Sequence, residues 1–371
     1  MVNILFIGNY PPPFSGQSIA FKTLIDGYSI EHNNFYLINT IEKSNKRGVF
    51  SRLFDYLRVL IKILYYLTTK KIHTVYHIVS SSNKGFVRDF LIINLTKLFG
   101  KKIILHSHNG NYDLFYATNS LFFQNIIRYT INKADKIILL SYKLRNTFSF
   151  INEDSKFSYI PNGLPLNSNE VKKNNNKSYI SVLFLSNLIE SKGYLDILKA
   201  IIILKEQGTI AQFHFNFAGM FMLNHSQDVS YKTIEVAQKL FFELIESNNL
   251  KEFVTFHGVV HGVEKEQLLK NSDVFLLPTY YNIEAQPITI IEAMAYGCAI
   301  YSTNYRAISD MLLDGVNGEF VEPRNPKSIA LKLNQINKHK LLEYSKKSVE
   351  LYEKGFTQKE HLRKMFKILS I

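Results

Sequence analysis

Residues 274–302 read VFLLPTYYNIEAQPITIIEAMAYGCAIYS, and this stretch decides the fold. The apolar runs Val274–Leu277 and Ala299–Ser302 predict two strands that are covered on both faces. Between them, Pro287–Tyr296 predicts a helix with a proline in its first turn. A strand, a crossover helix and a second strand form the repeating unit of a parallel sheet, so the sequence indicates the α/β class.

The same alternation continues in both directions from this stretch. Further strands are predicted at Asn3–Gly8, Phe35–Asn39, His73–Ser80, Lys102–Ser107, Lys136–Leu140, Tyr179–Leu185, Phe213–Ala218 and Val254–Phe256. Further helices are predicted at Ser18–Tyr28, Val49–Thr68, Lys84–Phe99, Leu121–Asn132, Lys192–Lys205, Tyr231–Glu246, Glu264–Lys270 and Phe356–Ile371. We therefore expect two doubly wound α/β domains that face each other across a cleft, with ligands at the carboxyl ends of their strands.

A polar stretch divides the two series. Residues 161–178, PNGLPLNSNEVKKNNNKS, are typical of a linker. We place the first domain at 1–165 together with about 356–371, the linker at 166–178 and the second domain at 179–355. A length of 371 residues suits two domains.

Composition narrows the class of protein. Hydrophobic residues at 46% and charged residues at 20% exclude a disordered or fibrous chain. The single Cys298 excludes a disulfide-stapled fold and suits a reducing cytosol. The net charge of +13 favours an anionic partner, such as nucleic acid, an acidic membrane or a phosphorylated substrate, unless it only keeps the surface soluble. We expect neither a signal peptide nor a membrane-spanning helix.

The first loop lacks the common nucleotide motifs. Gly8-Asn-Tyr-Pro-Pro-Pro-Phe-Ser-Gly16 does not have the G-x-G-x-x-G pattern, and no P-loop motif occurs in the chain. These facts disfavour a nicotinamide enzyme and a P-loop NTPase. Gly16 lets a backbone N–H approach a ligand closely, or it simply turns the chain into a helix.

His106 and His108 stand at the end of a predicted strand. A histidine there exchanges a proton or binds a sugar hydroxyl near pH 7. We expect that only one of the two faces the cleft, and a hydrogen-bonded structural pair remains the alternative. A metal site needs further ligands, for which His77 and Asp113 are the candidates, with nothing to fix their approach.

Three charged residues lie where loops enter helices. Lys192 beside a helix N-terminus suits a diphosphate. Glu284 and Glu292 stand eight residues apart, one in the loop and one in the helix. Carboxylates placed there can bind a ribose diol and a sugar hydroxyl, while the free N–H groups within residues 286–289 face the ligand. Solvated surface charges are the alternative for all three.

These motifs together resemble the retaining glycosyltransferases of family 4, which have the GT-B fold. Glu284 to Glu292 resembles that family's E-x7-E motif. Further similar motifs, in the family's order, are Tyr10–Gly16, Ile160–Gly163, Phe256–Gly258, Ala293–Ile300 and Asp314–Gly318. The resemblance covers nearly the whole chain, and it departs from the family at Ser15, Asn187, Ala285, Gln286 and Ala299.

The resemblance implies that the first domain binds the acceptor and that the second domain binds the nucleotide-sugar donor. It also implies a role for each matching position. Glu284 contacts the transferred sugar, Glu292 holds the ribose and Lys192 pairs with the diphosphate. Other donor-binding positions are Gly16, Asn187, Val260, Ala285, Gln286, Pro287 and Ile288, with Asn187 in place of the family's arginine. His108 lies beside the reacting sugar, and His106 is the fallback for that role.

The implied reaction moves a hexose from a nucleotide diphosphate sugar with retention at the anomeric carbon. We expect a UDP-sugar rather than a GDP-sugar, no cofactor and no divalent metal, since the chain has no D-x-D triplet. The expected acceptor is a glycan or a polyprenyl-type lipid-linked saccharide in surface polysaccharide, capsule, lipopolysaccharide or glycolipid synthesis. Another GT-B enzyme, such as a sugar-nucleotide epimerase, is the first alternative, and a basic nucleic-acid binder is the second.

The helix Val49–Thr68 has two interpretations. Leu53, Leu57, Leu60, Ile61 and Leu64 can form one apolar face, preceded by the basic segment Lys43–Arg47. That face either packs into the core, which we favour, or rests on an anionic leaflet beside a lipid-linked acceptor. The second interpretation predicts a cytoplasmic protein that is peripheral on the inner face of the membrane.

Overall fold

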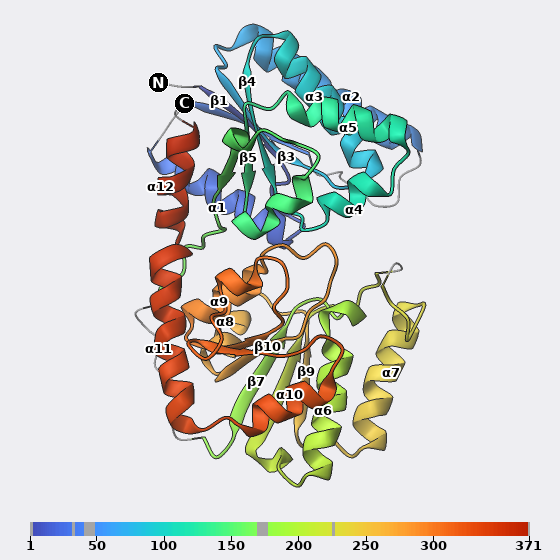
Figure 1. Cartoon of the computed structure of the whole chain (residues 1–371), viewed down its shortest axis with the longest axis vertical. Coiled ribbons are helices and arrows are strands. Elements are labelled where there is room, and N and C mark those ends of the chain that lie inside the picture. Colours follow the sequence, from blue (N-terminus) through green and yellow to red (C-terminus); the bar gives the residue numbers. More distant parts are fainter. Residues whose placement is uncertain (1–2, 32–33, 41–48, 169–176, 225–226, 370–371) are drawn as a thin grey trace. The chain divides into compact units, whose positions relative to one another are not determined.

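The chain folds into two compact units. The computed structural model describes residues 3–31, 34–40, 49–168, 177–224 and 227–369. Unit 1 contains Met1–Pro165 and Phe356–Ile371, and unit 2 contains Leu166–Gly355 (Figure 1). The predicted linker lies mostly outside the described residues. The last segment of the chain belongs to the first unit, so unit 1 is built from two separate pieces of sequence.

Unit 1 is built on a six-stranded parallel sheet of order β2-β1-β3-β4-β5-β6. The strands are β1 Ile4–Gly8, β2 Phe35–Asn39, β3 Thr74–Val79, β4 Lys102–Ser107, β5 Lys136–Leu139 and β6 Phe157–Tyr159. The chain moves from β1 to one side and then crosses to β3 on the other side. The topological switch point of this sheet therefore lies between the carboxyl ends of β1 and β3.

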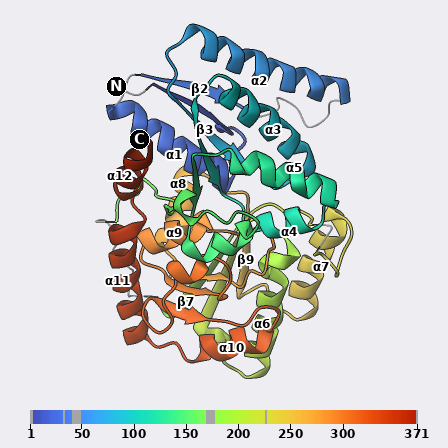
Figure 2. The same cartoon turned by 45° about the horizontal axis from the view of Figure 1, so that its top comes forward.

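Helices cover both faces of this sheet. They are α1 Gly16–Glu31, α2 Val49–Thr69, α3 Asn83–Leu98, α4 Tyr112–Ala117, α5 Leu121–Asn132 and α12 Gln358–Leu369, with 3-10 turns at Tyr142–Phe148 and Asp154–Lys156. Helix α12 lies against α1 in both views (Figures 1 and 2). Its Leu362, Met365 and Leu369 enter the same core cluster as Phe6 and Phe21.

Unit 2 repeats the plan with the strand order β12-β11-β10-β7-β8-β9. Its strands are β7 Ile180–Leu185, β8 Phe213–Ala218, β9 Val254–Gly258, β10 Val274–Leu277, β11 Ala299–Ser302 and β12 Gly318–Phe320. All five strand pairs are parallel. Here the switch point lies between β7 and β10, because β8 and β10 flank β7 on opposite sides.

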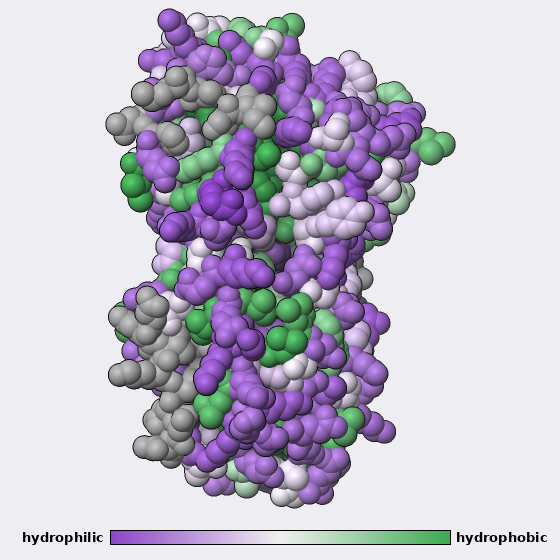
Figure 3. Space-filling view, turned by 60° about the vertical axis from the view of Figure 1, so that its left-hand side comes forward, coloured by the Kyte–Doolittle hydropathy of each residue, from purple (hydrophilic) through white to green (hydrophobic). Residues whose placement is uncertain are grey.

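The helices of unit 2 are α6 Tyr194–Glu206, α7 Ile234–Ser247, α8 Gly262–Lys270, α9 Ile288–Ala295, α10 Pro326–Asn334 and α11 Lys338–Gly355. Short 3-10 turns lie at η3 Glu190–Lys192, at Ile210–Gln212 and at Ile308–Asp310. The surface of unit 2 that carries α11 is largely hydrophilic (Figure 3). Within the described residues, no helix is long and apolar enough to cross a membrane.

The α/β class and the two doubly wound sheets predicted from the sequence are confirmed. The helix predicted at Lys192–Lys205 is wrong at its start. A 3-10 turn ends at Lys192, and α6 begins at Tyr194. Gly193 between them has a left-handed backbone conformation, with a φ of 84°, that interrupts the helix. A Cβ on Gly193 would lie 2.5 Å from the carbonyl oxygen of Pro278, so this close approach needs glycine.

The core interpretation of the α2 face is also wrong. Leu57 is 53% exposed, Ile61 58% and Leu64 43%, although they were expected to pack inward. The side of α2 that enters the core carries Val59, Ile63 and Leu67 instead. The apolar residues of α2 cover more than one face, so their spacing alone did not identify the buried one. The side chain of Leu53 and the segment Lys43–Arg47 lie outside the described residues.

Candidate functional site

Lys192 and Glu284 meet at the switch point of unit 2. Lys192 ends the turn η3 that follows β7, and Glu284 lies in the loop that follows β10. The Lys192 Nζ atom is 2.9 Å from Glu284 Oε2, and both side chains are largely buried. The ammonium also lies 5.2 Å from the ring centroid of Tyr281. A buried ion pair at this edge of a parallel sheet is a candidate ligand site rather than a pair of solvated surface charges.

Backbone hydrogen bonds fix the two loops against each other. The Tyr280 amide donates to the Ser191 carbonyl at 2.8 Å, which ties the loop after β10 to η3. The Glu284 amide donates to the Tyr281 carbonyl at 2.9 Å and closes a turn. Lys192 and Glu284 are therefore held by rigid backbone before any ligand arrives.

Glu190 anchors a third loop at the same place. Its buried carboxylate accepts hydrogen bonds from the amides of Val229 and Ser230 at 2.8 and 2.9 Å, and from the Ser230 hydroxyl at 2.7 Å. The carboxylate thus holds the loop after β8 beside η3. The sequence analysis missed this residue, because its partners lie about forty positions further along the chain.

Glu292 lies on α9, and Lys265 on α8 is its partner. The Lys265 Nζ atom is 2.5 Å from Glu292 Oε1, whereas the buried Oε2 atom has no hydrogen-bond partner. Burial raises the pKa of the Glu292 carboxyl, and the charge of Lys265 opposes part of that rise. A buried carboxylate with one oxygen left over is well suited to accept hydrogen bonds from a diol. Sequence reasoning did not identify Lys265.

The loop between the two glutamates is buried. Ala285, Gln286 and Ile288 are at most 5% exposed. Pro287 was expected in the first turn of the helix, but it is the N-cap, and α9 begins at Ile288. No side chain caps this helix end, so its first amides depend on other partners.

The other two donor positions predicted in unit 2 also lie at strand ends. Val260 is buried in the short connection between β9 and α8, the helix that carries Lys265. Asn187 is exposed directly after β7, five residues before Lys192. Of the eight predicted donor positions other than Gly16, six therefore lie after β7, β9 or β10, and the other two, Ile288 and Glu292, lie in α9.

Gly16 and the two histidines belong to unit 1. Gly16 is exposed and is the first residue of α1. The two histidine side chains, His106 and His108, do not point to opposite sides, as the expectation that only one of them faces a ligand assumed; whether one or both face a ligand stays a prediction. Residues two apart on a strand share a face, and the two ring centroids lie only 4.1 Å apart.

His106 is buried and His108 is half-buried, and both are neutral near pH 7. Burial lowers the pKa of His108 to about 3, and electrostatic repulsion from His361 contributes to this shift. Burial also lowers the pKa of His106 well below its usual range. His106 Nδ1 bonds the Tyr76 hydroxyl at 2.6 Å, while the Nε2 atoms of both histidines have no partner. A neutral imidazole with a free ring nitrogen suits a hydrogen bond better than proton transfer.

His77, one of the two residues considered for a metal site, has other partners. His77 Nε2 lies 2.9 Å from Asp89 Oδ1, and its Nδ1 faces the Ile7 carbonyl at 3.3 Å. Among the described residues, no group of three or more histidine, cysteine or acidic side chains could hold a metal ion.

Comparisons with known proteins agree with this geometry. A family profile described as glycosyl transferases group 1 matches residues 167–356, about half of the chain. The putative colanic acid biosynthesis glycosyltransferase WcaL of Escherichia coli K12 is 25% identical over 197 residues, which are 51% of this chain and 45% of WcaL. The amylovoran biosynthesis glycosyltransferase AmsK of Erwinia amylovora is 24% identical over 163 residues, 42% of this chain and 36% of AmsK. The matches thus span less than half of either relative.

Solved structures match over the whole length. HepE of Anabaena, solved in complex with UDP, has a TM-score of 0.75 at 16% identity and covers 100% of both chains. The lipopolysaccharide outer core galactosyltransferase WaaB has a TM-score of 0.67 at 16% identity and covers 100% of this chain and 99% of its own. The two doubly wound sheets define the GT-B class of fold. The chain belongs to the glycosyl transferases group 1 family.

Proposed function

We propose that this chain is a retaining hexosyltransferase of family 4 that uses a nucleotide diphosphate sugar as its donor. The observation that carries the proposal is the buried Lys192–Glu284 pair at the switch point of unit 2. A diphosphate pairs with the Lys192 ammonium, and this frees Glu284 to accept hydrogen bonds from the sugar. In the proposed complex, the Lys192–Glu284 ion pair is replaced by one contact of Lys192 with the diphosphate and one contact of Glu284 with the sugar.

Glu292 supplies the third contact of the proposed donor site. Its free oxygen accepts a hydrogen bond from a ribose hydroxyl, while the charge of Lys265 favours the ionised carboxyl against the effect of burial. The buried backbone at Ala285–Ile288 and the uncapped start of α9 line the sugar and phosphates, and Val260 presents its backbone to the base. HepE has been solved with UDP and with UDP-glucose, which supports a UDP-sugar as the donor.

The proposed reaction needs no divalent metal. An acceptor hydroxyl oxygen bonds to the anomeric carbon while the bond from that carbon to the diphosphate breaks, and the hydroxyl proton passes to the departing phosphate on the same face. Lys192 and the helix end stabilise the charge that develops on the leaving group. The role of His108, or else His106, as a hydrogen-bond partner of the reacting sugar remains a prediction.

A donor screen tests the proposal. The protein is incubated with a panel of UDP- and GDP-sugars, with and without EDTA, and slow hydrolysis is followed by NMR, which also reports the anomeric configuration. We expect hydrolysis of a UDP-sugar with retention and no effect of EDTA. Net inversion, or complete loss of activity with EDTA, contradicts the mechanism. An epimerised nucleotide sugar formed without any acceptor favours the epimerase.

We further propose that the acceptor is a saccharide, free or lipid-linked, in the synthesis of a surface polysaccharide or glycolipid. The names of WcaL, AmsK and WaaB support this setting. On α2, Leu57, Ile61, Leu64 and Tyr65 are exposed at positions i, i+4, i+7 and i+8, so they form one apolar stripe. Lys62, exposed on the same helix, and the net charge of +13 suit an anionic lipid surface, as a peripheral cytoplasmic protein needs.

A further inference from the structure

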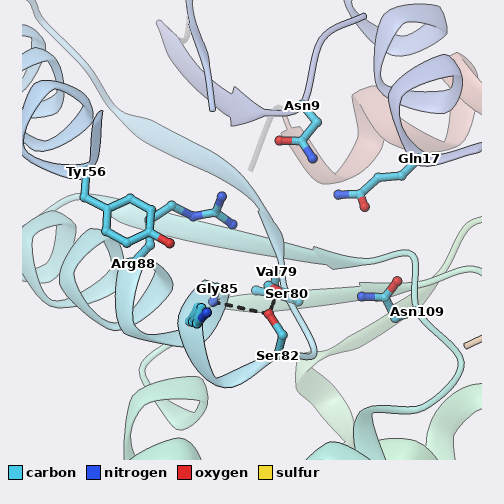
Figure 4. A pocket seen from close by; sticks show the side chains of 10 residues that line it. Asn9, Gln17, Tyr56, Val79, Ser80, Ser82, Gly85, Arg88 and Asn109 are labelled. Carbon is cyan, nitrogen blue, oxygen red and sulfur yellow. Dashed lines mark hydrogen bonds between the residues drawn. The ribbon is translucent and has the colours of Figure 1, made fainter. Parts of the chain in front are cut away.

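Unit 1 contains a cavity at its own switch point. The cavity has a volume of about 290 Å³ and lies where β1, β3 and β4 end (Figure 4). It is lined by Asn9, Gln17, Tyr56, Val79, Ser80, Ser82, Lys84, Gly85, Arg88 and Asn109. In unit 2, the Lys192–Glu284 pair occupies the equivalent place between β7 and β10. Each sheet therefore carries a candidate ligand site at the position where doubly wound sheets bind ligands.

Among the residues that the structure describes, the lining is polar and includes no acidic side chain. Asn9, Gln17 and Asn109 lie on one side of the cavity, and Tyr56 and Arg88 lie on the other (Figure 4). Amide and hydroxyl groups of this kind offer both donors and acceptors, as sugar hydroxyls require. The volume is near the lower end of the range of about 300–1,000 Å³ for ligand pockets, so it suits one sugar unit rather than a long chain.

Two cations give the cavity its charge. Arg88 donates from Nε and Nη2 to Asp89 Oδ1 at 3.1 and 2.9 Å, which uses two of the five guanidinium N–H groups. The buried Asp89 also accepts from the Ser80 amide at 2.7 Å and from His77, so it positions both Arg88 and the loop after β3. Lys84 is exposed and pairs with no carboxylate among the described residues.

The start of α3 forms part of the cavity wall. Ser82 is the N-cap, and its hydroxyl accepts from the Gly85 amide at 3.2 Å. A Cβ on Gly85 would lie 2.1 Å from the Ser80 hydroxyl, so only glycine lets the loop and the helix come this close. Lys84 and Arg88, in the first turns of α3, therefore line the same cavity as the amides of Asn9 and Gln17.

We infer that this cavity binds the acceptor through an oxyanion, a phosphate or a carboxylate, carried on a sugar. The inference rests on the proposed function and names the chemical class of its acceptor. The amides bind the hydroxyls of the sugar, while Lys84 and Arg88 pair with its anionic group at the start of α3.

Direct binding tests the inference on the full chain. The probes are glucose 1-phosphate, glucuronic acid and neutral methyl glucoside, titrated by calorimetry or ligand-observed NMR. We expect at least one acidic probe to bind about tenfold or more tightly than methyl glucoside, and Lys84→Glu to weaken that binding by a similar factor. Lys346→Glu, an exposed control on α11 of unit 2, leaves it unchanged. Because Arg88 contacts Asp89, Arg88→Gln is included only if its thermal unfolding is normal.

The outcomes separate the two proposals. Preference for the phosphate or for the carboxylate identifies the source of the anion, and either supports the inference. If methyl glucoside binds as tightly as the acidic probes, or if Lys84→Glu binds them as tightly as the unmodified protein, the inference is overturned. Donor hydrolysis in the same preparation would still support the proposed function. If acidic probes bind but no nucleotide sugar is hydrolysed, the proposed function fails and the acceptor role fails with it.

Discussion

Lys192 and Glu284 depend on each other in the absence of substrate, so removing either leaves a largely buried charge without its partner. Lys192→Ala removes the cation that pairs with the leaving diphosphate, and we expect kcat to fall by about 100-fold. Glu284→Gln keeps the shape of the side chain and should lower activity by a similar factor. Donor hydrolysis rates, checked against thermal unfolding curves, measure the effect. Full turnover by both variants contradicts the site.

Lys265 acts on the substrate through Glu292 and is therefore a positioning residue. Burial already raises the pKa of the Glu292 carboxyl, and Lys265 opposes that rise. In Lys265→Met the pKa therefore rises further, and the acidic limb of the kcat/KM profile moves to higher pH if ribose binding needs the ionised form.

The matched control for this prediction is Lys270→Met. Lys270 is on the same helix, α8, and pairs with Glu266 one turn earlier instead of with Glu292. Its pH profile should match that of the unmodified protein. A Lys265→Met profile that keeps its acidic limb in place rules out the positioning role.

Some of these residues could be found from the sequence, and others could not. Lys192 and Glu284 were predictable because each lies in the segment that follows an apolar strand, and the carboxyl ends of parallel strands share one edge. Lys265 and Glu190 have no such local signal, since their partners are 27 and about forty positions away. Only the fold brings them to the site.

At the scale of the element, α2 makes a specific prediction. A glutamate at position 57 or 61 places a charge in the apolar stripe, so Leu57→Glu with Ile61→Glu should reduce binding to anionic vesicles by about tenfold or more. Sedimentation with phosphatidylglycerol vesicles measures this. Val236→Glu, an exposed apolar position on α7 of unit 2, is the control. Equal sedimentation of all three proteins removes the membrane proposal.

The elements themselves were predictable to different degrees. Long apolar strands such as β3 and β4 were predicted almost to the residue, because strands covered on both faces are apolar throughout. The sequence analysis missed α11, which buries only Tyr344, Ser348 and Tyr352 and is otherwise polar. It also missed β6 and β12, which have three residues each and carry too little pattern.

At the scale of the whole molecule, buried histidines predict sensitivity to acid. The pKa of His108 is lowered to about 3 and that of His361 to about 4, both by burial, and that of His106 is lowered as well. An unfolded chain takes up protons on these residues near their ordinary pKa of about 6.5, before the folded chain does. Stability is therefore full above about pH 6.5 and falls below it, by about 1.4 kcal/mol per pH unit for each proton.

Urea unfolding at pH 7 and pH 5 checks this slope. His108→Gln should make the slope shallower by the contribution of about one proton. His339→Gln changes an exposed residue on α11 and should leave the slope as it is. A free energy of unfolding that stays constant between these two pH values contradicts the prediction.

The two-piece construction of unit 1 has a consequence for synthesis on the ribosome. His361 on α12 bonds the Pro161 carbonyl at 2.7 Å across 200 positions, and Gln358 bonds the Thr23 carbonyl at 2.9 Å across 335. The amino-terminal part of unit 1 is therefore synthesised before α12, which covers the apolar surface of α1. That surface stays exposed until unit 2 and α12 have been translated. Unit 1 begins to be synthesised first but is completed last. A stalled or prematurely released polypeptide therefore exposes this hydrophobic surface to chaperones and proteases.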